Sequence, residues 1–154
     1  MAEALAKDKA VVVIGAGTMG SGIAEVAAAA GHRVYLRDTS AEALDRGIGQ
    51  IRASLDKRVQ RGKLGAAERD ATVARLVPVG PDAKLDDVGL VIEVIVENLD
   101  VKVAVLRQIE SEVGADTIVA TNTSSLSVTA IAGRLARPER VVGMHFFNPA
   151  PVLP

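Results

Sequence analysis

The chain has 154 residues, which is long enough for one domain with a sizeable core. Its 18 basic and 19 acidic residues nearly balance, which argues against a surface for nucleic acid or another polyanion. The sequence has no cysteine, which excludes disulfides and thiolate metal sites, and no apolar run of the length of a signal peptide or a membrane span. We therefore expect a cytoplasmic protein without a membrane or nucleic-acid partner.

Short apolar segments alternate with helical segments along the chain. Strands are expected at 10–14, 33–37, 90–96, 117–121 and 140–146. Helices are expected between them at 18–30, 100–113 and 127–136. This alternation predicts an α/β domain of the Rossmann type, with a doubly wound, mostly parallel sheet and right-handed crossovers.

The segment between the second and third expected strands is longer than one crossover helix. Thr39 and Glu42 fit a T-x-x-E capping box, and helical sequence follows to about residue 60. The stretch "RGKLG" at 61–65 predicts a turn, and "AAERDATVARL" at 66–76 predicts a second helix. We expect a helical hairpin of about residues 40–76, here called the arm, added to the sheet.

The far end of the arm is basic, with Arg52, Lys57, Arg58, Arg61 and Lys63. Such a cluster is typical of a solvated charged face. It is also compatible with a surface that binds an anionic substrate, and the sequence alone leaves both interpretations open.

The stretch "IGAGTMG" places Gly15, Gly17 and Gly20 in the pattern G-x-G-x-x-G. Because it directly follows an expected strand and opens an expected helix, it indicates a dinucleotide-binding turn. Asp38 ends the second strand, where an acidic residue accepts hydrogen bonds from the adenosine ribose. Its charge would repel a 2′-phosphate, which favours NAD over NADP, although the neighbouring Arg37 is a mild signal in the other direction.

Five motifs resemble the NAD-dependent L-3-hydroxyacyl-CoA dehydrogenases, including the bacterial 3-hydroxybutyryl-CoA dehydrogenases. They are "VIGAGTMGSGIA", "GHRVYLRD", "IVENLDVK", "ATNTSSLSVTAIA" and "RPERVVGMHFFNP", and the likeness extends over residues 9–154. The resemblance implies an oxidoreductase of fatty-acid metabolism and β-oxidation. Such an enzyme oxidises a 3-hydroxyacyl-CoA substrate to the 3-ketoacyl-CoA and transfers hydride to NAD.

The resemblance also implies roles for individual residues. His145 matches the catalytic base, and a histidine titrates near working pH. Ser124 matches the serine that binds the substrate oxygen, with a helix N-cap as the alternative, which Ser125 or Ser127 could provide instead. Implied cofactor contacts are Gly15, Gly17, Thr18, Met19, Gly20, Asp38, Glu97, Lys102, Asn122, Ser124 and Asn148.

Two further assignments follow from the same resemblance, since Ser54 and Arg61 in the arm match positions that contact coenzyme A. Lys102 has a solvated lysine in the first turn of a helix as its alternative interpretation. His32, which follows a helix end, is expected to be structural.

In the resembling enzymes, a segment reading "LVE" follows the "HFFNP" motif, and its glutamate orients the histidine. An all-helical C-terminal domain comes after it and forms a homodimer interface. The present sequence ends at Pro154, before either of these. We therefore expect an isolated cofactor domain that binds NAD but is inactive alone. The alternatives are a stand-alone NAD-binding regulatory module, against which "HFFNP" argues, and a crystallin-like structural protein, which would require a lens source.

Overall fold

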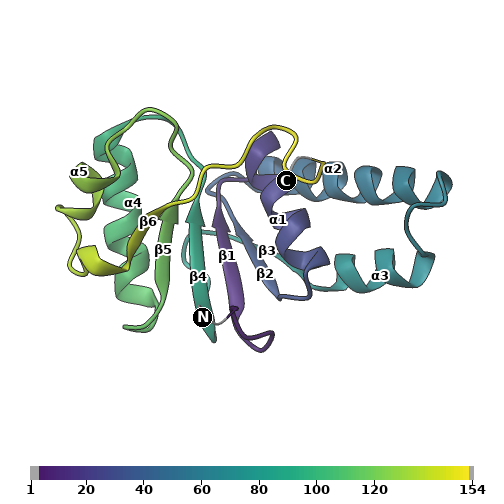
Figure 1. Ribbon diagram of the computed structural model, residues 1–154, viewed down its shortest axis with the longest axis horizontal. Coiled ribbons are helices and arrows are strands. Elements are labelled where there is room, and N and C mark those ends of the chain that lie inside the picture. The colour runs from purple at the N-terminus through teal and green to yellow at the C-terminus, as the bar shows by residue number, and fades with distance from the viewer. Residues whose placement is uncertain (1–3, 153–154) are drawn as a thin grey trace.

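A six-stranded sheet forms the centre of the molecule, in the computed structural model that describes residues 4–152 (Figure 1). The strand order is β3-β2-β1-β4-β5-β6, and every neighbouring pair is parallel. The strands are β1 (Ala10–Ile14), β2 (Val34–Arg37), β3 (Leu76–Val79), β4 (Val88–Glu93), β5 (Ile118–Thr121) and β6 (Val141–Gly143). The predicted α/β class with a doubly wound parallel sheet is confirmed.

The strand order reverses between β1 and β4. The chain first adds β2 and β3 on one side of β1, and then returns to place β4, β5 and β6 on the other side. In a sheet of this kind, the loops after the two central strands diverge and leave a crevice at the carboxyl ends of the strands. A ligand site is therefore expected at that end, which lies at the top of Figure 1.

The helices cover both faces of the sheet. They are α1 (Thr18–Ala29), α2 (Ala41–Gln60), α3 (Ala66–Ala74), α4 (Leu99–Glu112) and α5 (Val128–Ala132), with a short 3₁₀ helix η1 (Pro138–Arg140) before β6. In β1, Val11 and Val13 pack in one apolar cluster with residues of α1 and α2. Val12 packs in a second cluster with residues of α4 and α5. Alternate side chains of a fully buried strand thus complete both cores.

The arm is the pair of helices α2 and α3, which extends beyond the sheet at the right of Figure 1. Its root is apolar, since Ile51 and Leu55 are buried in the same cluster as α1. At Gly47, an added Cβ would lie 2.7 Å from the Ser21 hydroxyl oxygen and 3.0 Å from the Ala16 carbonyl oxygen. A glycine there lets α2 approach the beginning of α1 closely.

The capping box predicted at the start of the arm is wrong by one residue. Ser40, not Thr39, is the N-cap of α2, and its hydroxyl accepts a hydrogen bond from the Ala43 amide. The cause is local. The Asp38 carboxylate accepts the Ser40 amide, so residues 38–40 form a bend and the helix begins one residue later than predicted. Glu42 instead pairs with Arg46 on the next turn.

The strand β3 was not predicted, so the sheet has six strands rather than five. The helix expected over 66–76 ends at Ala74, and the next residues pair with β2. Pro78 obscured this strand, because proline weakens a strand prediction, but an edge strand tolerates it.

Other expected boundaries were too wide. The strand expected at 90–96 is β4, which ends at Glu93, because the Ile95 amide turns back to the Glu93 carboxylate. The last expected strand stops at Gly143, so His145 lies after the strand rather than within it. The last expected helix stops at Ala132, where Gly133 is the C-cap.

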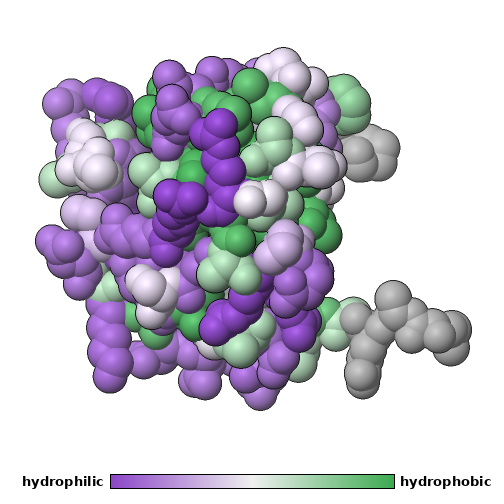
Figure 2. Space-filling model, turned by 90° about the vertical axis from the view of Figure 1, so that its left-hand side faces the viewer, coloured by the Kyte–Doolittle hydropathy of each residue, from purple (hydrophilic) through white to green (hydrophobic). Residues whose placement is uncertain are grey.

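The side of the molecule formed by α4 and α5 is mostly hydrophilic, with hydrophobic side chains gathered towards its upper edge (Figure 2). The exposed large apolar residues of the structure are Val96, Val101, Val142, Phe147 and Val152. None of the helices within residues 4–152 combines the length and the hydropathy that a membrane span needs.

Candidate functional site

The glycine loop joins β1 to α1 at the carboxyl edge of the sheet. Gly15 has φ of +110°, and a Cβ there would collide with the Val94 carbonyl oxygen. A Cβ on Gly20 would collide with the Gly15 carbonyl oxygen, so both glycines are required by close backbone packing. A Cβ on Gly17 would meet no atom within 4 Å, because this glycine lies exposed at the helix N-terminus. Open backbone beside free first-turn amides fits a pyrophosphate.

Thr18 and Met19 form the first helical turn after this loop. Thr18 is exposed, whereas Met19 is half-buried and packs against the apolar cluster of Val11 and Val13. The N-cap residue Gly17 makes no side-chain hydrogen bond, and the first amides of α1 have no intrahelical acceptor. An anion can therefore take the place that a capping side chain fills elsewhere.

Asp38 joins the end of β2 to the glycine loop. One carboxylate oxygen accepts the Ala16 amide at 2.9 Å, and the other accepts the Ser40 amide at 2.9 Å. The side chain is half-buried, so the rest of its acceptor capacity faces the crevice. This geometry suits the acidic residue of a dinucleotide site.

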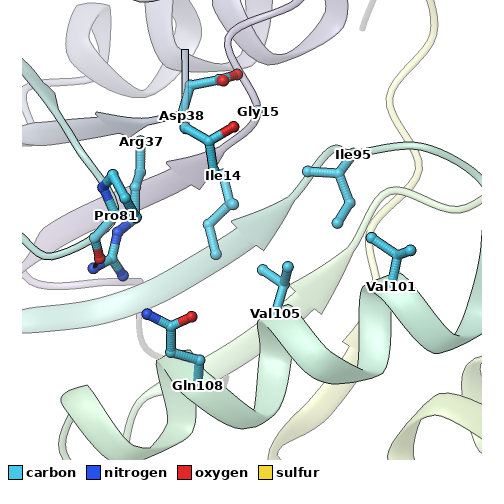
Figure 3. A pocket seen from close by; sticks show the side chains of 10 residues that line it. Ile14, Gly15, Arg37, Asp38, Pro81, Ile95, Val101, Val105 and Gln108 are labelled. Atoms are coloured by element: carbon cyan, nitrogen blue, oxygen red, sulfur yellow. Dashed lines mark hydrogen bonds between the residues drawn. The ribbon is translucent and has the colours of Figure 1, made fainter. Parts of the chain in front are cut away.

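Arg37 points away from Asp38. Its guanidinium pairs with Glu112 of α4 at 2.6 Å and also donates to the carbonyl oxygens of Gly80 and Pro81. Figure 3 shows Asp38 and Arg37 leaving the same strand end in opposite directions. Arg37, which was a mild signal for NADP in the sequence, is therefore buried and already paired with a carboxylate.

A cavity of about 260 Å³ lies beside Asp38. Figure 3 shows its apolar wall, to which Ile95 contributes from the loop after β4, and Val101 and Val105 from α4. The cavity can hold a small apolar group next to the Asp38 carboxylate.

The other predicted site residues lie on the far side of β1, on loops that follow β4, β5 and β6. Glu97 follows β4, Asn122 and Ser124 follow β5, and His145 and Asn148 follow β6. The carboxyl ends of parallel strands meet at one edge of a sheet. Residues distant in the sequence are thus brought to the same edge as the glycine loop.

Lys102 is buried, so the interpretation as a solvated lysine is wrong. Its ammonium lies 2.6 Å from a Glu93 carboxylate oxygen, 3.3 Å from the Ile95 carbonyl oxygen and 3.3 Å from a Glu97 carboxylate oxygen. Lys102 is thus enclosed by protein groups rather than directed into the crevice.

Glu97 holds two loops together. Thr123 and Ser125 of the loop after β5 donate their hydroxyls to one of its carboxylate oxygens, at 2.6 and 3.1 Å. Partial burial raises the pKa of Glu97, but these hydrogen bonds and the Lys102 charge outweigh it, so the pKa lies below its usual value. The carboxylate is therefore ionised at neutral pH.

Ser124 is exposed beside this network. It does not cap α5, because the Ser127 hydroxyl accepts the Ala130 amide and is the N-cap. The alternative reading of Ser124 as the helix cap is therefore wrong, and its side chain is available at the edge of the sheet.

His145 is exposed in the segment after β6, and its ring meets the Phe147 ring edge to face at 4.9 Å. Within residues 4–152 the imidazole makes no hydrogen bond to the protein. The segment itself is anchored, because the Asn122 side-chain oxygen accepts the Phe146 amide at 2.7 Å and the Thr121 carbonyl accepts the Met144 amide. Asn148, three residues after His145, is also exposed.

The two predicted coenzyme A residues differ in their surroundings. Ser54 is half-buried and donates its hydroxyl to the Glu25 carboxylate of α1 at 3.0 Å. Arg61 is exposed at the C-terminal end of α2, in the turn between the two arm helices. His32 is buried, and its Nδ1 lies 3.1 Å from the Lys9 carbonyl oxygen, as expected of a structural histidine.

The sequence analysis missed Glu93, whose side chain is 0% exposed, and its partner Thr121. A signal was present in "LVIEVIV", because a glutamate within an apolar strand must find a charged or hydrogen-bonding partner. Thr123 and Ser125 gave no comparable signal, since hydroxyl side chains are common in loops.

Fold and site together define a dinucleotide-binding domain of the Rossmann type. Residues 10–154 match the family described as "3-hydroxyacyl-CoA dehydrogenase, NAD binding domain". The chain belongs to this family.

Known relatives agree with this assignment. The chain is 54% identical to 3-hydroxyadipyl-CoA dehydrogenase of Escherichia coli (strain K12) over 143 residues, which are 93% of the chain and 30% of that protein. It is 44% identical to the fatty acid oxidation complex subunit alpha of Psychrobacter cryohalolentis over 142 residues, which are 92% of the chain and 20% of that protein.

Among solved structures, the fold matches 3-hydroxybutyryl-CoA dehydrogenase from Escherichia coli K12 with a TM-score of 0.91 and 53% identity. The match covers 94% of this chain and 31% of that chain. The present chain thus spans less than a third of each of these three relatives.

Proposed function

We propose that this chain is the cofactor domain of an enzyme that oxidises an L-3-hydroxyacyl-CoA to the 3-ketoacyl-CoA with NAD. The observation that carries the proposal is the meeting of two groups at one edge of the sheet. The glycine loop and Asp38 lie on one side of the β1–β4 crevice, and Ser124 and His145 follow strands on the other side. Two of the relatives are named as dehydrogenases of 3-hydroxyacyl-CoA compounds, which supports a 3-hydroxyacyl-CoA as the substrate.

The glycine loop and Asp38 would hold the cofactor at its adenosine and pyrophosphate end. The amides of Thr18, Met19 and Gly20 would face the pyrophosphate, and Asp38 would accept the ribose hydroxyls. The apolar cavity beside Asp38 would receive the adenine. A negative charge at Asp38 and a paired Arg37 both disfavour a 2′-phosphate, which supports NAD rather than NADP.

The nicotinamide end would then cross the crevice to the loops after β4 and β5. Glu97, Asn122 and Asn148 are proposed to contact it there. For Lys102, we propose an indirect role, because its three N–H groups already face three protein oxygens. It would act by fixing Glu97.

The chemical step needs a base at the 3-hydroxyl, while the bound cofactor supplies a hydride acceptor. His145 is proposed to take the hydroxyl proton on a ring nitrogen, and its exposure at the sheet edge leaves it accessible to substrate. Ser124 is proposed to donate its hydroxyl to the same substrate oxygen, which would orient the 3-carbon towards the cofactor.

The arm is proposed to contact coenzyme A. Arg61 is exposed near Lys57 and Lys63, and within residues 4–152 these three cations form no ion pair. They are therefore available to phosphate groups. Ser54 could contact the same ligand only through the side of its hydroxyl that Glu25 leaves open.

We propose a cytoplasmic location and a homodimer in the intact enzyme. Both rest on the resemblance of the motifs, and the greater length of the relatives is compatible with a second domain that forms the dimer. Light scattering of the intact enzyme tests the dimer directly.

Two measurements test the main proposal. Calorimetry of this chain with NAD should show binding, and the intact enzyme should form NADH from L-3-hydroxybutyryl-CoA. An absence of NAD binding by a folded chain would overturn the proposed function. If the chain binds NAD but the intact enzyme forms no NADH, the chain is a cofactor-binding module and the proposed dehydrogenase reaction is wrong.

A further inference from the structure

Three charged side chains meet between the loop after β4 and the start of α4. They are Glu93 at the end of β4, Glu97 in the loop and Lys102 in α4. The side chains of Glu93 and Lys102 are 0% and 1% exposed, whereas that of Glu97 is 43% exposed. The pair Glu93–Lys102 is thus sealed in the protein, and Glu97 is the member that reaches the surface.

The geometry divides the Lys102 charge unequally between the two carboxylates. Its ammonium lies 2.6 Å from the nearer Glu93 oxygen and 3.3 Å from the nearer Glu97 oxygen. The attraction between two charges increases as their separation and the surrounding dielectric fall. The ammonium therefore interacts more strongly with Glu93 than with Glu97, and one ammonium cannot neutralise both carboxylates.

Glu93 is fixed by further contacts. One of its oxygens also accepts the Ile95 amide at 2.8 Å, and the other accepts the Thr121 hydroxyl at 2.6 Å. A buried ion pair is stable only when the remaining lone pairs are hydrogen-bonded, as they are here. Glu93 cannot turn away and leave Lys102 to Glu97.

Glu97 consequently keeps its negative charge. One positive and two negative charges leave a sum of one negative charge in the cluster. The lowered pKa of Glu97 agrees with an ionised carboxylate at neutral pH. The negative charge lies on the half of the sheet, at β4 and β5, over which the second nucleotide of a dinucleotide lies in such a fold.

We propose that Glu93, by neutralising Lys102, leaves the charge of Glu97 free to favour the oxidised cofactor, with its cationic nicotinamide ring, over the neutral reduced ring. This inference rests on the proposed function, which places the nicotinamide at the loops after β4 and β5. Glu93 is in this view a positioning residue, since it acts through Lys102 and Glu97. The site thereby shifts the balance between NAD⁺ and NADH towards NAD⁺.

The size of the effect follows from the interaction of two unit charges near a protein surface. At separations of several ångströms and an effective dielectric between those of protein and water, one charge changes an affinity by about three- to tenfold. The ratio of the NADH and NAD⁺ dissociation constants, here called the redox ratio, is the quantity to measure. A general loosening of the site changes both constants and leaves the redox ratio constant.

The experiment is calorimetric titration of this chain with NAD⁺ and with NADH at neutral pH. Glu97→Gln should lower the redox ratio by about three- to tenfold, because the attraction to the cationic ring is lost. Lys102→Met should not lower the redox ratio, because the exposed Glu97 keeps its charge and the buried Glu93, once it has lost its cation, is the carboxylate that takes up a proton. Asp100→Asn is the matched control, because Asp100 lies in the same helix turn as Lys102. Its carboxylate is 88% exposed and is paired with Arg134.

The role of Glu93 is tested by two further variants. Glu93→Gln frees the Lys102 charge for Glu97 and should lower the redox ratio as Glu97→Gln does. Because it leaves a buried ammonium without its main partner, this variant can fail to fold. The double variant Glu93→Gln/Lys102→Met removes both buried charges and should keep the parental redox ratio. It tests the role of Glu93 if the single variant Glu93→Gln does not fold.

A redox ratio that falls in Glu97→Gln but not in Lys102→Met would support the proposal. A fall in both variants, or a redox ratio that is unchanged by Glu97→Gln, would overturn it. If the parental chain binds neither cofactor form, the proposed function itself fails, and the two failures are thereby distinguished.

Discussion

The Asp38 carboxylate accepts a hydrogen bond from the Ala16 amide at 2.9 Å, so the end of β2 and the glycine loop hold each other in place. The same carboxylate accepts the Ser40 amide and thus fixes the start of the arm as well. One side chain therefore sets the positions of the two segments that border the adenosine end of the proposed cofactor site.

Replacement of Asp38 should separate its charge from its hydrogen bonds. Asp38→Asn keeps an oxygen acceptor but loses the charge, so the discrimination against NADP should fall while NAD affinity changes less. Asp38→Ala loses both, and NAD affinity should fall by about 1.5–3 kcal/mol, the usual contribution of a hydrogen bond to a charged group. Calorimetry with NAD and NADP measures both effects. Undiminished discrimination in both variants would remove Asp38 from the proposed role.

His145→Ala should abolish most turnover in the intact enzyme. A positioned general base contributes about 10²–10⁴ to the rate, and a loss of this size is expected in NADH formation from L-3-hydroxybutyryl-CoA. Because His145 is exposed and makes no hydrogen bond within the described residues, thermal stability and NAD affinity should remain unchanged. A stable variant with parental turnover would show that another group is the base.

If the basic residues of the arm bind coenzyme A, the affinity for acyl-CoA should depend on their charge. Lys57→Ala/Arg61→Ala should weaken the binding of acyl-CoA to the intact enzyme about two- to tenfold, as expected for exposed charged contacts, and less at high salt. Arg46→Ala is the matched control, because Arg46 lies on the same helix but is exposed near its other end and paired with Glu42. If the double variant and the control behave alike, the basic cluster is a solvated face.

The glycine loop and Asp38 were predictable because each is a local signal. A dinucleotide turn needs particular residue types at fixed spacings, and the pattern occurred between an expected strand and an expected helix. The edge strand β3 was less predictable, because its partner β2 lies some forty residues earlier and a proline interrupts its apolar run. Tertiary pairing decided that segment rather than local propensity.

The network around Glu97 shows a second limit. The sequence places Glu93, Lys102 and Thr121 in three different elements, and only the parallel pairing of β4 with β5 brings them together. The spacing from Glu93 to Lys102 spans the end of a strand and a helix start, so no single periodicity connects them. A glutamate in an apolar strand indicated a buried partner without identifying it.

The raised pKa of Glu25 allows a prediction of how the stability of the domain depends on pH. Its carboxylate is buried between α1 and the arm, where burial raises its pKa although the Ser54 hydroxyl and the Arg58 guanidinium, 3.9 Å away, oppose this. The folded chain thus holds this proton more tightly than the unfolded chain does. The associated stability is fully present below the unfolded pKa and is lost as the pH rises through the folded pKa.

Glu25→Gln should remove this pH dependence, since the amide keeps an acceptor for Ser54 but does not ionise. Urea unfolding should therefore show that the variant is at least as stable as the parent at pH 7, and that its advantage disappears at pH 4. Glu42→Gln is the control, because Glu42 is 80% exposed and its loss should not change the slope between these two pH values. A variant that is less stable at pH 7 than at pH 4, relative to the parent, would mean that the ion pair with Arg58 outweighs the cost of burying the charge.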